Sequence, residues 1–379
     1  MIDGFNKTME KIKVLHIIKS LGRGGAEMLL PETLKKHNQD RFEFHYIYFL
    51  PWKNQLAEAI ESAGGEVSCF SAKNNIQLLL QYSKIIKYCI KHQIQIIHAH
   101  LPWAGFVCRI VHYKTDIPVI YTEHNLQERY HFITKLINKW SFNFQTIAIG
   151  VSEDVTQSIL QNVNPKIPYK TILNGVNIES FQRNDSEHRS VIRRQYGIPD
   201  EALLVGTVAV FRFQKRLDKW LEIIRDAIEV NPNIYGIIVG AGPLEQEIFA
   251  KHKELNLKGK VFFTGLQTNI KPYYQAIDVF MMSSSFEGLP IALLEAMSMG
   301  CAIVSTNAGG IKEVIQYKEN GIMVEVDDWK NLSSSLLTLV ENPSQLAYFQ
   351  MESRKRVAAN FSIKAMVTEL ETLYISCRL

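Results

Sequence analysis

The sequence predicts an α/β protein made of two doubly wound, Rossmann-like domains. Short β-branched segments alternate along the chain with longer segments of helical period, the pattern of parallel strands joined by helices. A length of 379 residues is too great for one ordinary core and suits two domains of this size. We place the domains at residues 1–182 and 201–360, with a polar linker at 183–200 and a terminal segment at 361–379.

Composition indicates a globular protein of a reducing compartment. Hydrophobic residues make up 46% of the chain and charged residues 21%, and no run of 18 apolar residues is present. Residues 1–13 contain no apolar stretch, so we expect no signal peptide and a cytoplasmic location. The 5 cysteines show no CxxC spacing, which indicates buried thiols. The net charge of +4 is mild and gives no reason to expect a nucleic-acid partner.

The first predicted strand, 14–18, ends in a glycine turn before a helix at 26–36. Strand, glycine turn and helix form a phosphate cradle, because backbone N–H groups point to the helix N-terminus. Gly24 and Gly25 are the candidate residues of this cradle. Glu27 stands where a dinucleotide fingerprint needs Gly or Ala for helix packing, which argues against a dehydrogenase.

Histidines follow the next strands of this domain. We expect strands at 44–49, 66–70, 94–99, 118–122 and 146–151, and helices at 54–63 and 76–91. In a parallel sheet Gly24, His100 and His124 all fall at the carboxyl edge, where ligands bind. His124 is a candidate site residue, with a strand-end cap as the alternative. His98 and His100 share a strand face, but no third ligand is evident, so we expect no metal there.

Aromatic and basic residues interleave in segment 129–144. Its aromatic residues include Tyr130, Phe132, Trp140, Phe142 and Phe144. Two interpretations stay open: a core helix with a polar outer side, or a cationic, aromatic face that rests on an anionic membrane.

The second domain opens with a strand at 203–210 that delivers Arg212, Lys215 and Arg216. Cations at a strand end form an anion clamp, and a solvated basic loop is the alternative. A strand at 234–239 leads into the turn 240–243, which contains Gly240 and Gly242.

Two carboxylates stand out in segment 283–313. An apolar run at 276–282, which is a buried strand or the approach to one, precedes it. Pro290 opens a helix, and a further strand leads to a glycine loop at 307–310. Glu287 lies before this helix and Glu295 within it among apolar residues, where a buried carboxylate needs a partner. The alternative is that Glu287 complements the helix dipole and Glu295 pairs with a distant Lys or Arg.

The pattern of residues 287–290 (Glu-Gly-Leu-Pro), 295–297 (Glu-Ala-Met) and 309–310 (Gly-Gly) resembles the Glu-x7-Glu signature of retaining GT-B glycosyltransferases of family four. The resemblance covers nearly the whole chain. It implies the GT-B architecture, two Rossmann-like domains facing across a cleft, with the segment 361–379 as a helix that crosses back to the first domain.

The resemblance also implies roles for the candidate residues. The catalytic residues would be Arg212, Lys215, Glu287 and His124. The donor-binding residues would be Gly24, Gly25, Gly240, Gly242, Gly288, Leu289, Pro290 and Glu295. Arg212 and Lys215 would hold the donor diphosphate, with Arg216 as the alternative to Lys215; Glu287 would hold the sugar and Glu295 the ribose. His124 would lie on the acceptor side.

The implied activity is retaining transfer of a sugar from a UDP- or GDP-linked donor to a glycan or lipid-linked acceptor, in bacterial cell-surface polysaccharide biosynthesis. Protein cations would replace a divalent metal, and no cofactor is expected. The enzyme would be cytoplasmic, with peripheral contact to the inner face of the plasma membrane if segment 129–144 is interfacial. The alternatives are a GT-B nucleotide-sugar epimerase or phosphorylase, or a non-catalytic nucleotide-sugar binder. We find no pyridoxal lysine segment of the kind a phosphorylase needs.

Overall fold

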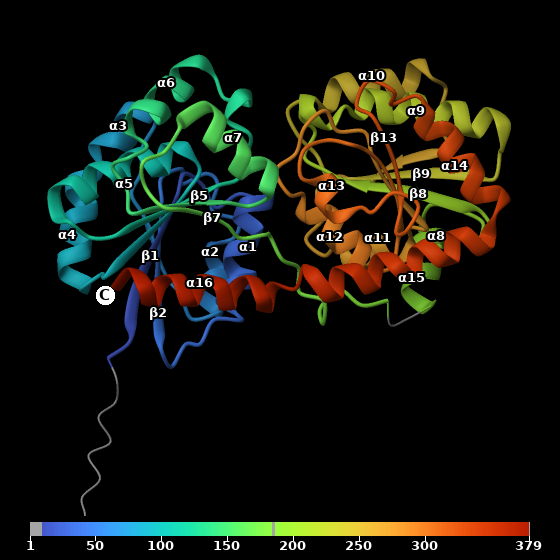
Figure 1. Cartoon of the computed structure of the whole chain (residues 1–379). Coiled ribbons are helices and arrows are strands. Elements are labelled where there is room, and N and C mark those ends of the chain that lie inside the picture. The colour runs from blue at the N-terminus through green and yellow to red at the C-terminus, as the bar shows by residue number, and fades with distance from the viewer. Residues whose placement is uncertain (1–9, 184–185, 379) are drawn as a thin grey trace, which may run out of the picture. The chain divides into compact units, whose positions relative to one another are not determined.

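The computed structural model describes residues 10–183 and 186–378. The chain folds as two compact units: residues 1–173 with 363–379, and residues 174–362 (Figure 1). The first unit therefore ends before the boundary expected at 182, because residues 174–176 are bonded to the second unit. Within these residues Val176 N–H donates to the Phe361 carbonyl. Residues 1–9, to which the expectation of no signal peptide applies, lie outside the described residues.

The first unit contains a parallel sheet of seven strands. The strands are β1 (Ile12–Ile18), β2 (Phe42–Tyr48), β3 (Glu66–Cys69), β4 (Ile96–His100), β5 (Val119–Glu123), β6 (Ile147–Gly150) and β7 (Tyr169–Thr171). Their spatial order is β3-β2-β1-β4-β5-β6-β7, the doubly wound arrangement that the alternation of strands and helices predicts. β4 and β5 are buried along their whole length, as parallel strands covered on both faces are.

Helices cover this sheet (Figure 1). They are α1 (Gly25–Leu34), α2 (Ala57–Ser62), α3 (Asn75–Leu80), α4 (Tyr82–His92), α5 (Pro102–Thr115), α6 (Phe132–Ser141), α7 (Glu153–Val163) and α16 (Ile363–Arg378), with a 3-10 turn η1 (Gln127–Arg129). The single helix expected at 76–91 is wrong. It is divided into α3 and α4 at Gln81, whose ψ of −7° is that of a turn and whose side-chain amide donates to the Ser71 carbonyl.

The second unit contains a parallel sheet of six strands in the order β10-β9-β8-β11-β12-β13. The strands are β8 (Leu203–Val208), β9 (Ile234–Val239), β10 (Val261–Phe263), β11 (Val279–Met282), β12 (Ala302–Thr306) and β13 (Ile322–Val324). Within the apolar run 276–282 the strand is β11, which begins at Val279, and the first residues of the run lead to it from a helix that ends at Ala276.

The helices of the second unit follow its strands in turn. They are α8 (Ser186–Gln195), α9 (Leu217–Val230), α10 (Glu245–Glu254), α11 (Lys271–Ala276), α12 (Ile291–Ser298), α13 (Ile311–Val314), α14 (Asn331–Glu341) and α15 (Pro343–Asn360), with a 3-10 turn η2 (Phe213–Lys215). Both units are therefore Rossmann-like. In the described ranges, no helix combines the length and the apolar character that crossing a bilayer would require.

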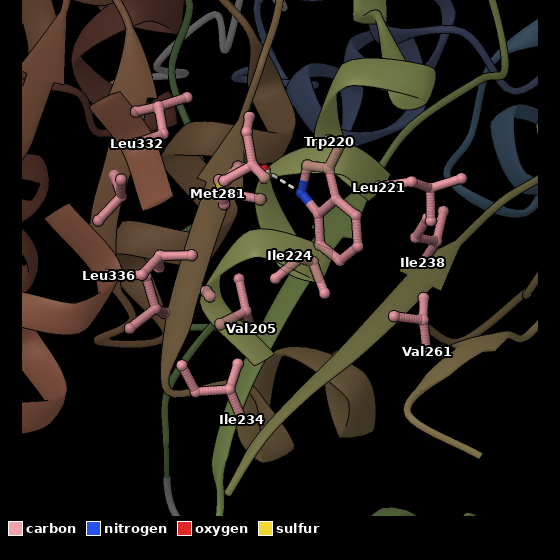
Figure 2. Close-up of a cluster of buried hydrophobic side chains, with 14 of the residues drawn as sticks. Val205, Trp220, Leu221, Ile224, Ile234, Ile238, Val261, Met281, Leu332 and Leu336 are labelled. Atoms are coloured by element: carbon pink, nitrogen blue, oxygen red, sulfur yellow. Dashed lines mark hydrogen bonds between the residues drawn. The ribbon is translucent and has the colours of Figure 1, made fainter. Parts of the chain in front are cut away.

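The core of the second unit holds its sheet and α9 together. Trp220 of α9 is fully buried among aliphatic side chains of the neighbouring strands (Figure 2). Its indole N–H donates to the Met281 carbonyl of β11 at 3.1 Å, so the ring buries its surface without leaving its polar atom unpaired. This core fixes β8 beside β11, and thereby the loops that follow the two strands.

Candidate active site

Loops of the second unit meet at the carboxyl edge of its sheet, as parallel strands require. They follow β8, β9, β11 and β12 and comprise residues 209–216, 240–243, 283–290 and 307–310. The turn after β9 packs directly on the loop after β8. Gly240 has φ +131°, and a Cβ there would lie 2.0 Å from the Ala209 carbonyl oxygen. A Cβ on Gly242 would lie 2.5 Å from the Phe211 backbone nitrogen, so both positions need glycine.

The glycine loop after β12 packs in the same way on the loop that carries Glu287. Gly309 has φ +61°, and a Cβ there would lie 2.1 Å from the Glu287 carbonyl oxygen. Gly310 N–H donates to the Gly288 carbonyl at 3.0 Å. The four loops therefore form one continuous backbone surface on which a ligand can be held.

Glu287 forms an ion pair at this edge. Lys215 Nζ lies 2.6 Å from Glu287 Oε1, and Ser284 Oγ donates to the same oxygen at 2.6 Å. The Glu287 residue is only 9% exposed. Two of the predicted catalytic residues, 72 positions apart in the chain, are thus in direct contact. Glu287 has a specific partner in addition to any effect on the helix dipole.

The three predicted cations differ in what they contact. Arg216 donates through Nε to the Ser283 carbonyl at 2.6 Å and through Nη2 to the Val326 carbonyl at 3.1 Å. Its guanidinium therefore joins the loops after β8, β11 and β13. Arg212 is exposed, and its side chain makes no ion pair or hydrogen bond within residues 10–183 and 186–378. Arg212 is therefore available to an anion, Lys215 is shared with Glu287, and Arg216 is committed to structure.

Helix α12 begins beside the ion pair. Pro290 is its N-cap residue, with φ −73° and ψ 119°, so the helix starts one residue later than expected. The preceding carbonyl, that of Leu289, accepts from Asn174 Nδ2 at 2.9 Å. Glu287, Gly288, Leu289 and Pro290 thus lead into a helix N-terminus, a position whose N–H groups and dipole favour an anion.

Glu295 lies in the second turn of α12 and is 8% exposed. The hydroxyl of Tyr274 donates to Glu295 Oε2 at 2.8 Å. Burial and the neighbouring carboxylate hold the pKa of Tyr274 well above its ordinary value, so the phenol keeps its proton and remains a donor. The sequence analysis did not identify Tyr274, since an isolated tyrosine in α11 carries no signal of its role.

A second group of predicted residues lies at the carboxyl edge of the sheet of the first unit. Gly24 is the N-cap residue of α1, directly after β1, and Glu27 stands in the first turn of this helix. A Cβ on Gly24 would lie 2.3 Å from Glu27 Oε2, so the glutamate side chain folds back over the glycine turn. Gly25 is the first residue of the helix.

Three histidines at this edge form a connected row. His124 Nε2 lies 3.3 Å from His100 Nδ1, and His100 Nε2 lies 2.9 Å from His16 Nδ1. A cavity of about 20 Å³ lies against these rings and His98. Burial lowers the pKa of His124 to about 4 and that of His98 to about 3, so both rings are neutral at pH 7.

A third imidazole, that of His16, lies beside His98 and His100, although no third ligand was evident from the sequence. The parallel pairing of β1 and β4 places it directly beside His98. Both ring nitrogens of His98 are occupied, however: they bond to the Tyr374 hydroxyl and to Thr122 Oγ1, each at 2.7 Å. The arrangement is a buried hydrogen-bonded network.

Glu123 fixes the backbone around His124 and was not assigned a role from the sequence. This fully buried carboxylate accepts from His124 N–H at 3.0 Å and from the Tyr121 hydroxyl at 2.7 Å. Gln127 Nε2 and the Tyr130 hydroxyl donate to it as well. Burial raises the pKa of Glu123 and the hydrogen bonds oppose that shift. A histidine at the end of β5 is therefore held on a rigid support.

The segment 129–144 has two sides. Phe142 is fully buried, whereas Phe132 and Trp140 are 72% and 77% exposed. Ile133 and Leu136 of α6 are exposed on the same helix. The core interpretation therefore holds for Phe142 but not for Phe144, which is exposed, and α6 itself presents apolar side chains to solvent.

Two Rossmann-like units, each with a doubly wound parallel sheet, are the architecture of the GT-B glycosyltransferases. Two family models agree: residues 23–180 match the family described as Glycosyltransferase Family 4, and residues 188–358 match Glycosyl transferases group 1. The chain belongs to the family-4 glycosyltransferases and is an enzyme that transfers hexosyl groups.

Several known proteins resemble the chain over most of its length. The capsular polysaccharide biosynthesis glycosyltransferase CapH of Staphylococcus aureus is 25% identical over 96% of this chain and 99% of its own. The UDP-Gal:alpha-D-GlcNAc-diphosphoundecaprenol alpha-1,3-galactosyltransferase of Escherichia coli is 23% identical over 97% and 98%. Among solved structures, Anabaena HepE in complex with UDP-glucose superposes with a TM-score of 0.86 at 21% identity, covering 96% of this chain and all of that one. This likeness establishes the GT-B fold.

Proposed function

We propose that this enzyme transfers a hexose, with retention of anomeric configuration, from a UDP- or GDP-linked donor to a glycan or lipid-linked acceptor. The product would enter a bacterial cell-surface polysaccharide. The observation that carries the proposal is the ion pair of Lys215 and Glu287 close before the N-terminus of α12, with the exposed Arg212 on the same loop as Lys215. Two cations and a helix dipole in one group of loops support a binding site for an anion.

In this proposal the donor diphosphate lies between Arg212, Lys215 and the start of α12. The negative charge on the diphosphate grows as the bond to the sugar breaks, and preorganised cations stabilise that charge most in the transition state. Lys215 keeps two of its three N–H donors for the phosphates while the third is directed at Glu287. Protein cations then take the role that a divalent metal has in other transferases.

Glu287 and Glu295 would recognise the two ends of the donor. Glu287, held by Lys215 and Ser284, would accept hydrogen bonds from sugar hydroxyls through its remaining oxygen. Glu295, held by Tyr274, would accept from the ribose hydroxyls. The backbone of Gly240 and Gly242 leaves room for the nucleotide because neither carries a side chain. The names of the relatives support a UDP donor: one is named for UDP-Gal, and HepE was solved with UDP-glucose.

We assign the acceptor side to the first unit, at the carboxyl edge of its sheet, where His124 directly follows β5. His124 is neutral and rigidly held, so it would accept or donate one hydrogen bond to an acceptor or sugar hydroxyl without a charge of its own. The relative from Escherichia coli is named for a diphosphoundecaprenol-linked acceptor, which supports a lipid-linked class of acceptor.

Donor turnover tests the proposal. The protein is incubated with radiolabelled UDP- and GDP-sugars, with and without a membrane extract as the source of acceptor, and release and transfer of the label are measured. We expect one donor to be consumed and its nucleotide diphosphate to raise the melting temperature by mass action. Stabilisation by nucleotide without any turnover would favour a binder, and label recovered as a different free nucleotide sugar would favour an epimerase.

Helix α6 supports contact with the inner face of the plasma membrane. Its exposed apolar residues Phe132, Leu136 and Trp140 accompany Lys135 and Lys139, and the helix contains no acidic residue. An apolar face with cations at its rim matches an anionic bilayer surface, where aromatic rings enter the interface and lysines meet lipid phosphates.

Liposome co-sedimentation tests this contact. We expect the protein to bind vesicles that contain anionic lipid, and the variant Trp140→Ala with Lys135→Glu and Lys139→Glu to lose that binding. A control with Lys253→Glu and Lys258→Glu, exposed lysines of the second unit, carries the same change of charge from its two lysines. Equal loss in the control, or unchanged binding of the α6 variant, would contradict the assignment of the surface to α6.

A further inference from the structure

A second polar cluster lies in the first unit, on elements that carry none of the candidate active-site residues. His45 of β2 is the direct cross-strand neighbour of Glu66 in β3, and His92 is the last residue of α4. The ligand atoms of these three side chains all lie within 4.8 Å of one another. The His45 side chain is only 1% exposed, whereas those of His92 and Glu66 are 20% and 52% exposed, so the cluster opens to solvent on one side.

The contacts of the His45 ring leave two hydrogen-bond acceptors facing each other when the ring carries a single N–H. His45 Nε2 lies 2.8 Å from Glu43 Oε1, which places the single N–H of a neutral ring on Nε2. The other ring nitrogen, Nδ1, then turns its lone pair toward Glu66 Oε2 at 3.3 Å. Two acceptors cannot hydrogen-bond to each other, whereas both can bind the same metal ion.

The hydroxyl of Tyr88 does not resolve this contact between two acceptors. Its hydroxyl oxygen lies 2.9 Å from His45 Nδ1 and 3.2 Å from Glu66 Oε1. The hydroxyl has one hydrogen, and it can be directed to the ring or to the carboxylate but not to both. Whichever contact it satisfies, another pair of lone pairs remains face to face.

The spacing of the ligand atoms suits a metal ion. His45 Nδ1 and Glu66 Oε2 are 3.3 Å apart, and His92 Nδ1 and Glu66 Oε1 are 3.6 Å apart. Bonds of 2.0–2.2 Å in a tetrahedral site separate neighbouring ligand atoms by roughly 3.3–3.6 Å. The contact between His92 and Glu66 is too long for a hydrogen bond, so it has no function as one. Glu43 on the far nitrogen of His45 completes the carboxylate–histidine–metal arrangement that fixes a ligating ring.

We propose that His45, Glu66 and His92 bind a divalent transition-metal ion of the zinc type, with Glu43 orienting His45. Two imidazoles and one carboxylate favour such an ion over Mg²⁺ or Ca²⁺, which prefer oxygen ligands. The ion would tie the end of α4 to β3, the edge strand of the sheet. This site is structural and separate from the donor site, for which protein cations are proposed.

Zinc titration of chelator-treated full-length protein tests the site. We expect the wild type to bind one Zn²⁺ per chain and to melt at a higher temperature with Zn²⁺ than with Mg²⁺. His92→Ala and Glu66→Ala remove solvent-facing ligands and should abolish both effects. Glu43→Gln should weaken Zn²⁺ binding about 10- to 100-fold, the usual effect of removing such a partner. Lys91→Ala, an exposed neighbour of His92 on the same helix, should bind Zn²⁺ as the wild type does.

Three results would overturn the proposal. They are the lack of stoichiometric Zn²⁺ uptake by the wild type, uptake that persists unchanged in both ligand variants, and equal binding of Mg²⁺. Circular dichroism of each variant establishes that it is folded, and since donor binding lies in the other unit, nucleotide-induced stabilisation should survive in all of them.

Discussion

Replacing Lys215 by Met should destabilise the protein and inactivate it, for two separable reasons. Lys215 and Glu287 form a largely buried pair with side chains that are 18% and 10% exposed. Breaking a buried pair by removing one partner leaves an uncompensated charge and costs about 3–5 kcal/mol. Because Ser284 still donates to Glu287, we expect the lower end of that range. For a domain of this size about 3 kcal/mol lowers the melting temperature by roughly 6–12 °C.

Turnover should fall by about 100- to 1,000-fold, since one charge-stabilising contact of the transition state is lost. A double-mutant cycle separates the two effects. Adding Glu287→Gln removes the unpaired charge, so the double variant should regain most of the lost melting temperature while staying inactive. The measurements are differential scanning calorimetry and initial rates with the identified donor. Additive losses of stability would show that the pair is not coupled, and normal turnover of Lys215→Met would refute its role at the diphosphate.

Three further results are expected. Arg212→Ala should lower turnover and weaken binding of the nucleotide diphosphate in calorimetry, while the melting temperature without ligand stays within about 1 °C, because this side chain is exposed. Glu295→Gln should weaken nucleotide affinity with turnover at saturation closer to normal, and Tyr274→Phe should do so more mildly; intact affinity with lost turnover would contradict a ribose contact. Burial depresses the pKa of His98 to about 3 and of His124 to about 4, so the unfolded chain binds protons first as pH falls below about 6.5. The free energy of unfolding should therefore fall by about 2 kcal/mol for each of these two histidines between pH 6.5 and pH 5. An equal melting temperature at pH 7 and pH 5 would contradict this expectation.

Much of the fold follows from local patterns in the sequence. The strand expected at 234–239 coincides with β9, and α7 begins at Glu153 with Ser152 as its cap. These elements are fixed by a β-branched apolar run and by a capping side chain, both of which are local. The break at Gln81 was missed because a single residue in turn geometry leaves the apolar spacing of the flanking helices unchanged.

The contacts of the candidate site follow from strand order, which the sequence does not reveal. β8 lies beside β11, and this adjacency brings Lys215 to Glu287. Likewise, β1 lies beside β4, and this adjacency brings His16 to His98 and His100, for which no third histidine was evident from the sequence. Which residues sit at strand ends could be read from the chain, whereas which ends are neighbours could not.

Residue type alone does not decide which of the two cations at the end of the 3-10 turn η2 would contact the diphosphate. Lys215 and Arg216 are adjacent and equally charged, and spacing did not separate them. The backbone does, because Arg216 has φ +45° and a guanidinium whose planar fork donates to two carbonyls at once. An ammonium is a point charge without that fork, so lysine at 216 could not join the same two loops in this way. The residue better suited to hold backbone is thereby used for structure, and the flexible ammonium of Lys215 remains for the carboxylate and the proposed diphosphate.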